Sequence, residues 1–341
     1  MAHNDKTVHK GDIGRAAETR QRAEEPGLRT GECPLVSVVV PNYNHSAYLR
    51  ERIETILNQT YPHIEIFLLD DASTDGSLGI MQEYAGDSRV RMVESNARNS
   101  GSAFRQWAKG IALAQGKYVW IAESDDSCDP HLAETLAGLL EQTGSVVAFC
   151  RSLRIDGAGR ELAQSVSKSW RRDFRADGET FVRRCLTGYN HICNASGVMF
   201  RRDAAMRAGS DYTEYTASGD RLFWSELCLQ GRVSYTAAAL NRFRQHGDKV
   251  SDKAERSGLN ICEDHRIYEL LCERLQLSRR ERLLACGYHY QAIHSGRLTE
   301  EARHEAESLW QQEAEYGRGA YLKYMLHRAA EKAGLMDYPW S

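Results

Sequence analysis

The chain has 341 residues and a globular composition, which allows one large domain with an appendage or two modest domains. Its formal net charge of −3 and its pI near 6.5 give no general attraction to nucleic acid or to anionic lipid. Nine cysteines are an odd number and form no C-x-x-C pair, so a disulfide framework and a zinc site are not expected.

The beginning of the chain has no features of a buried or membrane-inserted segment. Residues 1–33 are charged and poor in large apolar side chains, which predicts a flexible or loosely helical extension. No signal-peptide core is present, and no apolar run approaches the roughly 20 residues that span a bilayer. A cytoplasmic protein is therefore expected, and peripheral contact with the inner face of the membrane stays open.

From residue 34 onward the sequence alternates between strand and helix patterns. The runs that predict strands are LVSVVVP, EIFLLDD, VRMVES, YVWIA and SVVAFC. Between these runs, apolar residues recur at helical spacing and predict four helices. One begins at Ser46, one follows Ser73, one ends before Gly116 and one follows Asp129. Strands that alternate with helices predict an α/β fold with a mainly parallel, doubly wound sheet.

Polar residues follow three of the predicted strands. These are Pro41-Asn42-Tyr43-Asn44, Asp70-Asp71 and Glu123-Ser124-Asp125-Asp126. Ligands of open α/β sheets bind at the carboxyl ends of the strands, so we expect the three groups to gather at one edge. Neighbouring carboxylates ionise together only at a cost, which a bound cation would offset. No glycine-rich phosphate loop is present, so a diphosphate held by Mg²⁺ or Mn²⁺ is expected.

Two long segments resemble the signature of family-2 glycosyltransferases, which have the GT-A fold. They are SVVVPNYNHSAYLRERIETILNQTYPHIEIFLLDDASTDGS and NSGSAFRQWAKGIALAQGKYVWIAESDD. The resemblance runs from about Val36 to Ser251 and consists of several ordered motifs. It implies a glycosyltransferase domain over residues 34–254, followed by a C-terminal helical region over residues 255–341.

The resemblance implies a site for a nucleotide-sugar donor. Pro41 and Tyr43 would line the nucleotide-base pocket, and Asp71 would accept a hydrogen bond from the base, which is usually uracil. Glu123 stands where the family most often has the first aspartate of its D-x-D motif. Glu123 and Asp125 would contact the sugar nucleotide, although the extra methylene of the glutamate leaves its direct contact open.

The resemblance also implies a divalent cation. Asp125, Asp126 and His246 would be the ligands of Mn²⁺ or Mg²⁺, since imidazole is an acceptable third ligand for Mn²⁺. His246 belongs to the segment NRFRQHGDKVS, in which Arg244 would assist the diphosphate.

The acceptor side is carried by SGDRLFWSELCLQG, in which Gly219 replaces a usual glutamate and Asp220 is retained. An alcohol attacks only as its proton is removed, so Asp220 is the candidate general base. Asp220 would equally serve as a helix cap. Asn194 and Ser196 are weaker candidates for acceptor contacts, and Trp224 fits the core better than the acceptor pocket.

Apolar stripes from about Arg256 to Gly334 predict C-terminal helices. Such stripes most often pack on their own domain. A homodimer contact, a wall of the acceptor site and a membrane-facing patch are the alternatives, and the sequence does not choose between them.

The resemblance therefore implies an inverting, metal-dependent glycosyltransferase of bacterial surface-glycan synthesis. It would move a hexose-type sugar from a UDP-linked donor to a hydroxyl of a glycan, a lipid-linked glycan or a protein. A catalytically degenerate sugar-nucleotide-binding or assembly subunit stays open because Glu123 and Gly219 depart from the family motifs. A glycoside hydrolase also pairs carboxylates but needs neither cation nor nucleotide. A nucleotidyltransferase would show a glycine- and basic-rich triphosphate loop, and none is evident.

Overall fold

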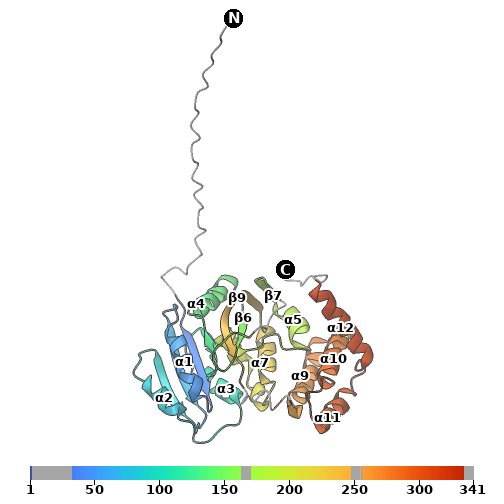
Figure 1. Cartoon of the computed structure of the whole chain (residues 1–341), viewed down its shortest axis with the longest axis horizontal. Helices are drawn as coiled ribbons and strands as arrows, with labels where there is room; N and C mark the ends of the chain where they lie inside the picture. Colours follow the sequence, from blue (N-terminus) through green and yellow to red (C-terminus); the bar gives the residue numbers. More distant parts are fainter. Residues whose placement is uncertain (2–32, 163–169, 247–253, 255, 334–341) are drawn as a thin grey trace. The chain divides into compact units, whose positions relative to one another are not determined.

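The computed structural model describes residues 1, 33–162, 170–246, 254 and 256–333 (Figure 1). The chain divides into two compact units after Glu32, and the unit that begins at Cys33 carries the described helices and strands. The predicted N-terminal extension over residues 1–33 therefore lies almost entirely outside the described residues.

The centre of the second unit is a nine-stranded sheet, as far as the described residues show. Its strands are β1 (Val36–Asn42), β2 (Ile64–Asp70), β3 (Val90–Ser95), β4 (Tyr118–Ile121), β5 (Ser127–Cys128), β6 (Val147–Ile155), β7 (Phe174–Asp177), β8 (Val198–Arg201) and β9 (Arg232–Arg244). The order is β3-β2-β1-β4-β8-β6-β9-β5, and β7 pairs with β9. Strands β3, β2, β1 and β4 are parallel, β6 and β9 are parallel, and β5, β7 and β8 run antiparallel to their neighbours. The predicted mainly parallel sheet is confirmed.

Helices pack on both faces of this sheet. The helices that accompany it are α1 (Ser46–Leu57), α2 (Ser77–Glu83), α3 (Ala103–Leu113), α4 (Leu132–Thr143), α5 (Gly178–Phe181), α6 (Arg202–Ala208) and α7 (Gly219–Cys228). Successive side chains of a strand point to opposite faces. Ile121 of β4 shares a core cluster with Trp107 of α3, whereas the neighbouring Trp120 lies beneath Arg52 of α1, with 5.1 Å between its ring centroid and the guanidinium carbon. The doubly wound arrangement is therefore confirmed.

The three polar strand ends meet at one edge, as predicted. Strand β1 pairs in parallel with β2 and with β4, so that Asn42 lies opposite Asp70, and Val39 lies opposite Ile121. The backbone N–H of Asp71 donates to the carbonyl oxygen of Asn42 at 2.8 Å. The residues after β4 follow at the same edge, which brings the acidic cluster beside the end of β1.

Beyond β9 the described chain is helical, which confirms the predicted C-terminal helices. They are α9 (Leu259–Leu275), α10 (Arg279–Ile293), α11 (Glu300–Trp310) and α12 (Arg318–Lys332). Buried side chains from all four of them, including Tyr268, Cys286, Trp310 and Ala320, form a core cluster of their own. Helices α10 and α12 pack side by side (Figure 1).

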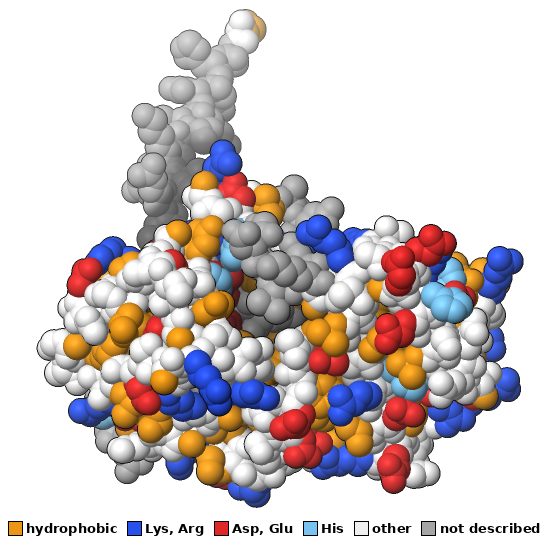
Figure 2. Space-filling view, turned by 90° about the horizontal axis from the view of Figure 1, so that it is seen from below, with side chains coloured by type: hydrophobic (Ala, Val, Ile, Leu, Met, Phe, Trp, Pro, Cys, Tyr) orange, Lys and Arg blue, Asp and Glu red, His pale blue; other side chains and the backbone are white. Residues whose placement is uncertain are grey.

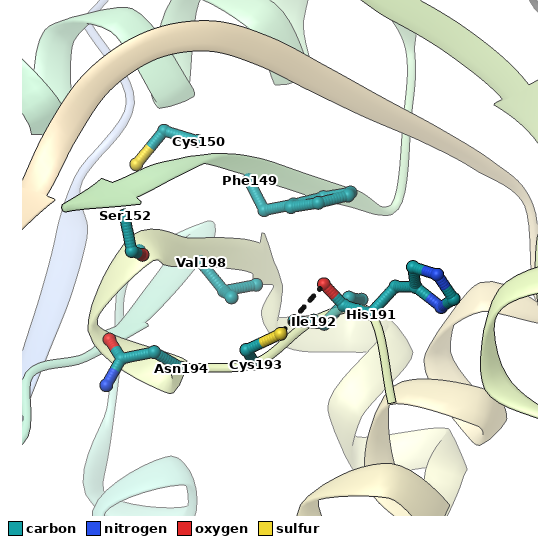
Figure 3. A pocket seen from close by; sticks show the side chains of 9 residues that line it. Phe149, Cys150, Ser152, His191, Ile192, Cys193, Asn194 and Val198 are labelled. Carbon is teal, nitrogen blue, oxygen red and sulfur yellow. Dashed lines mark hydrogen bonds between the residues drawn. The ribbon is translucent and has the colours of Figure 1, made fainter. Parts of the chain in front are cut away.

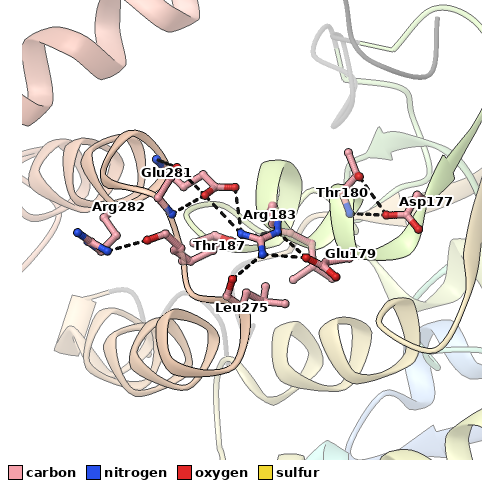
Figure 4. A network of polar contacts seen from close by, with 11 residues as sticks. Asp177, Glu179, Thr180, Arg183, Thr187, Leu275, Glu281 and Arg282 are labelled. Carbon is pink, nitrogen blue, oxygen red and sulfur yellow. Dashed lines mark hydrogen bonds and ion pairs between the residues drawn. The ribbon is translucent and has the colours of Figure 1, made fainter.

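Arg183 links these helices to the sheet region (Figure 4). Its Nε donates to Glu179 Oε1 of α5 at 2.8 Å, and its Nη1 lies 3.4 Å from the carboxylate of Glu281 on α10. Its Nη2 donates to the carbonyl oxygen of Leu275 at the end of α9. Glu281 also forms a capping box with Ser278 at the start of α10. One guanidinium thus connects helices that lie about 90 residues apart in sequence.

The face shown in Figure 2 carries charge of both signs, and its Lys and Arg side chains alternate with Asp and Glu side chains. That face therefore offers no continuous basic track for a nucleic-acid backbone to follow. Among the described helices, none combines the length and the apolar character needed to cross a bilayer.

Candidate active site

The end of β1 is tied to the end of β2 by side-chain hydrogen bonds. Asn42 Nδ2 donates to Asp70 Oδ1 and to Ser73 Oγ, both at 3.1 Å. Pro41 is buried, whereas the next aromatic residue, Tyr43, keeps 45% of its surface exposed. The structure therefore leaves the Tyr43 ring open to a ligand at the edge where the base pocket is predicted.

Asp71 is buried and accepts several hydrogen bonds from within the chain. Asn96 Nδ2 donates to it at 2.6 Å, Gln106 Nε2 at 2.8 Å, and Ser100 donates through both its N–H and its hydroxyl. A carboxylate offers about four lone-pair sites, so these donors use nearly all of its capacity. Asp71 ties β2 to the segment that begins α3, and the predicted contact with a base would compete with these donors.

The structure brings Asp125 and His246 together and adds a residue that the sequence did not single out. His246 Nε2 lies 3.0 Å from Asp125 Oδ2. His45, which follows β1, joins them, and one ligand atom from each of the three residues lies within 4.8 Å of the others. His45 Nδ1 lies 2.9 Å from Ser124 Oγ, which fixes the orientation of its ring.

The group formed by His45, Asp125 and His246 fits a divalent ion. Two imidazoles and one carboxylate make a mixed nitrogen and oxygen donor set, and Mg²⁺ prefers oxygen ligands in near-ideal octahedral geometry. Mn²⁺ lies between the hard ions and the imidazole-preferring metals in its ligand choice. The donor set therefore favours Mn²⁺ over Mg²⁺.

Asp126, the third predicted metal ligand, lies outside this group and is fully buried. Its carboxylate accepts hydrogen bonds from Ser196 Oγ at 2.7 Å, Asn194 Nδ2 at 2.8 Å and the backbone N–H of Arg244 at 2.9 Å. Burial and the nearby charge of Asp125 raise the pKa of Asp126. Asp126 thus holds together segments that carry three other predicted site residues.

Two arginines face the acidic cluster from inside the protein. Arg244 is buried, and it donates to the carbonyl oxygen of Asp125 at 2.7 Å and to Glu51 Oε2 at 2.6 Å. Its guanidinium therefore points into the protein rather than toward a diphosphate. Arg52 is also fully buried, and its charge opposes in part the rise that burial and Asp125 cause in the pKa values of Glu123 and Asp126. Part of the repulsion expected from the sequence is therefore offset within the chain.

The side chain of Glu123 turns toward α3. Trp107 Nε1 donates to Glu123 Oε1 at 2.8 Å, and the backbone N–H of Glu123 donates to Ser196 Oγ at 3.0 Å. Burial and the neighbouring charge of Asp125 raise the pKa of Glu123 to about 8. At neutral pH this carboxyl group mostly retains its proton, so the cluster carries less negative charge than its composition suggests.

Asp220 lies in the first turn of α7, as predicted. Asn190 Nδ2 donates to its Oδ2 at 2.9 Å, and the backbone N–H of Arg221 donates to its Oδ1 at 2.8 Å. Burial, with a smaller contribution from Asp264, raises the pKa of Asp220 to about 7. A carboxyl group with this pKa exchanges a proton readily at neutral pH, as a general base must.

Helix α9 holds the segment that leads into α7. Glu263 accepts hydrogen bonds from the backbone N–H groups of Thr216, Ala217 and Ser218, at 2.7 to 2.8 Å. Sequence reasoning missed Glu263 because it lies more than 40 residues beyond Asp220, and a glutamate within a helix gives no signal of its own.

The guanidinium of the buried Arg221 provides a second link between α7 and α9. It lies 2.9 Å from the Asp264 carboxylate and donates to the carbonyl oxygens of Leu186 and Thr187. Helix α9 therefore anchors the chain on both sides of Asp220, through the loop that precedes it and through Arg221, which follows it.

Gly219 has no room for a side chain. A Cβ at this position would lie 2.4 Å from the carbonyl oxygen of Tyr212 and 2.6 Å from Cδ2 of Phe104. The close approach of α7 to α3 explains why a glycine stands where the family usually has a glutamate.

Gly219→Ala should therefore lower the free energy of unfolding by about 1–3 kcal/mol, because the added methyl group overpacks a backbone contact. Urea titration at neutral pH measures the change. Gly79→Ala is the matched control, since Gly79 lies in α2 with open space around its Cα, and alanine should stabilise that helix by about 1 kcal/mol. Equal effects of the two substitutions would contradict the packing argument.

The remaining acceptor candidates lie inside the protein. Trp224 is fully buried, with its ring centroid 5.7 Å from that of Trp107. Asn194 Oδ1 accepts from Asn241 Nδ2 at 2.7 Å. Asn194 also lines a small cavity of about 10 Å³, roughly the size of one water molecule (Figure 3). That cavity is too small for a sugar, and the polar contacts of Asn194 and Ser196 include the hydrogen bonds that both donate to the Asp126 carboxylate.

The sequence family is established by its family model. The model described as "Glycosyl transferase family 2" matches residues 37–209, which is half of the chain. The matched residues contain the polar strand ends, Asp125 and Asn194. The chain belongs to this family and is a glycosyltransferase, as the sequence predicted.

Two curated relatives illustrate the similarity. An uncharacterised glycosyltransferase of Haemophilus influenzae is 29% identical over 224 residues, which are 64% of this chain and 68% of that protein. The putative teichuronic acid biosynthesis glycosyltransferase TuaG of Bacillus subtilis is 42% identical over 94 residues. This second match spans 27% of the chain but only 36% of TuaG, so it compares parts of the two proteins.

Solved structures share the fold. TarS 1–349 of S. aureus in complex with UDP-GlcNAc has a TM-score of 0.54 and 18% identity, and the match covers 88% of this chain and 92% of that one. The mannosyltransferase PcManGT of Pyrobaculum calidifontis, in complex with GDP-Man and Mn²⁺, has a TM-score of 0.53 and 15% identity, with coverage of 90% and 82%. At these identities the likeness concerns the fold, and it confirms the predicted GT-A type.

Proposed function

We propose that the chain is an inverting, metal-dependent glycosyltransferase that uses a UDP-linked sugar and acts in bacterial surface-glycan synthesis. The acceptor would be a hydroxyl of a glycan, a lipid-linked glycan or a protein. The observation that carries the proposal is the group of His45, Asp125 and His246 at the carboxyl edge of the sheet. The nucleotide sugars and Mn²⁺ bound by the structural neighbours, and the pathway in the name of TuaG, support it.

The donor side uses residues from three strand ends. The exposed ring of Tyr43 offers a face for stacking on a base, beside the buried Pro41. His45, Asp125 and His246 would hold the cation. When bound, the ion supplies positive charge where negative charge grows on the departing diphosphate.

The acceptor side depends on Asp220. A carboxyl group whose pKa is raised to about 7 is matched to proton abstraction from an alcohol near neutral pH. Asn190 orients it by donating to Oδ2. A single in-line displacement then inverts the anomeric carbon, with Asp220 receiving the hydroxyl proton and no carboxylate needed as a nucleophile.

The two parts of the chain have different tasks in this proposal. Residues 34–254 carry the donor and acceptor groups, whereas residues 255–341 hold the start of α7 through Glu263 and Asp264. The cytoplasmic location and the absence of a nucleic-acid partner remain predictions from the sequence.

A thermal-shift and turnover experiment tests the function. We expect UDP with Mn²⁺ to raise the unfolding temperature more than UDP or Mn²⁺ alone, because a ligand that binds only the folded state stabilises it by about 2.7 kcal/mol at 100 times its Kd. UDP-sugars should release UDP in the presence of Mn²⁺, and a chelator should stop the release.

The other functions predict different outcomes. GDP or other nucleotides serve as matched controls for the donor base. A glycoside hydrolase would keep its activity in the chelator, and a binding or assembly subunit would bind UDP without releasing product. A flat thermal response to every nucleotide tested with Mn²⁺ would contradict the proposal.

A further inference from the structure

A second surface lies on the C-terminal helices, on elements that carry none of the donor or acceptor groups. Helices α10 and α12 border a groove of about 770 Å³. We call this groove the α10–α12 surface, and its lining residues are Arg279, Arg280, Leu283, Leu284, Lys323, Leu326, His327 and Ala330.

The α10–α12 surface exposes large apolar side chains. Leu326 of the groove lining is 71% exposed, and Leu322, which lies beside the groove one helical turn away on α12, is 60% exposed. Only Ala320 among the residues of this 15-residue helix is buried. Helix α12 therefore presents an apolar stripe that is not covered by the described part of the chain, and such stripes mark interaction sites.

The same surface carries cations that have no acidic partner among the described residues. Arg279, Arg280 and Lys323 are exposed, and none forms an ion pair with a carboxylate among the described residues. The nearby Glu331 already pairs with His327 and Arg328. The groove is thus an apolar floor with a positive rim.

We propose that the α10–α12 surface docks the protein on an anionic phospholipid bilayer. Leucines beside Arg and Lys side chains are the composition of surfaces that lie in the headgroup region, where the cations meet lipid phosphates and the apolar side chains enter the acyl boundary. The inference is independent of the sugar transfer, because it concerns a different surface and a binding equilibrium.

Charge argues against the other occupants of this surface. A two-fold contact between copies of the chain through this surface would bring the two positive rims close together, and like charges repel. Nucleic acid would neutralise the cations but would leave Leu322 and Leu326 exposed to water. An anionic bilayer offers phosphates to the positive rim and an acyl region to the apolar floor.

Vesicle co-sedimentation of the full chain tests the proposal. The protein should bind vesicles of phosphatidylcholine with phosphatidylglycerol, bind vesicles of phosphatidylcholine alone much more weakly, and dissociate as salt is raised. The double substitution Arg279→Glu with Arg280→Glu should weaken binding by about 30-fold or more. Leu322→Ser with Leu326→Ser should weaken it as well, through loss of apolar contact.

The matched control is Arg171→Glu with Arg172→Glu, a second pair of adjacent exposed arginines, which should bind like the wild type. Circular dichroism and unfolding temperature establish that each variant is folded. The proposal is overturned if the wild type ignores the anionic vesicles, or if the control loses as much binding as Arg279→Glu with Arg280→Glu. A dimer in sedimentation that Leu322→Ser with Leu326→Ser dissociates would also overturn it.

Discussion

Asp220→Asn should nearly abolish sugar transfer while leaving donor binding intact. The amide has the same shape as the carboxylate, and its oxygen can still accept the hydrogen bond from the backbone N–H of Arg221. It has no lone pair basic enough to take the acceptor proton. General-base catalysis by a positioned side chain contributes about 10²–10⁴-fold to the rate, so kcat should fall by that factor. Steady-state kinetics give kcat, and calorimetric titration with UDP and Mn²⁺ gives the donor Kd.

The matched control is Asp177→Asn, because Asp177 caps α5 by accepting from the backbone N–H of Thr180. If Asp220 serves only as a cap, both substitutions should change stability little, because asparagine caps a helix about as well as aspartate, and both should leave kcat unchanged. Full activity of folded Asp220→Asn would exclude this residue as the base.

The pH dependence gives a second readout on Asp220. The base acts as the carboxylate, so kcat/KM should rise with pH through about 7. The folded-state pKa is raised, so the contribution of this group to stability is present below its unfolded pKa and is lost as pH rises through about 7. The unfolding free energy of the wild type should therefore fall relative to that of Asp220→Asn between about pH 4 and pH 7.

Asp125→Asn should remove most of the affinity for Mn²⁺, and His45→Ala should lower it by about tenfold or more. Loss of residues that merely orient metal ligands already costs 10–100-fold in affinity. Electron paramagnetic resonance of free Mn²⁺ measures binding without any need for turnover. His131→Ala is the matched control, because His131 lies 3.0 Å from Asp129 in an exposed pair that has no second histidine.

Asp126→Asn distinguishes the role of Asp126 from that of the neighbouring Asp125. Its carboxylate accepts three hydrogen bonds inside the protein, so this substitution should lower the unfolding temperature more than it lowers Mn²⁺ affinity. Wild-type affinity in His45→Ala would exclude His45 as a ligand. A loss of Mn²⁺ affinity in folded Asp126→Asn as large as in Asp125→Asn would return Asp126 to the ligand set.

The sequence predicted the fold and the meeting of the polar strand ends at one edge because both follow from local patterns. Buried strands appear as β-branched runs, and a parallel sheet places their carboxyl ends together. Strand β6 shows the limit of this reasoning. It continues to Ile155, beyond the apolar run that ends at Cys150, because it pairs in parallel with β9 through a local irregularity near Arg151.

The directions of individual side chains could not be predicted in the same way. Asp125 and Asp126 are adjacent in a turn closed by the N–H of Asp126 and the carbonyl oxygen of Glu123, and their carboxylates diverge, so one joins the histidines while the other is buried. His45 follows a recognisable strand, but one histidine among 12 has no pattern that marks it as a ligand. The contribution of Glu263 depends on a contact between distant parts of the chain, which no local pattern encodes.

Overall composition also concealed a local feature. A net charge of −3 gave no reason to expect an anionic partner, yet Arg279, Arg280 and Lys323 lie together on one surface and form no ion pair within the described structure. Net charge averages over the molecule, whereas docking responds to the charge within about one Debye length, roughly 8 Å at physiological salt.

Glu263 accepts hydrogen bonds from three backbone N–H groups, and these bonds determine what a shortened form of the protein could do. A fragment that ends at residue 254 would retain every residue proposed to contact the donor or its cation, yet the turn that presents Asp220 would lose its anchor. Such a fragment would be a competent nucleotide binder with impaired turnover. Exchange of the C-terminal helices between relatives should accordingly alter reaction rate more than choice of sugar donor, and the two halves are expected to evolve as a matched pair.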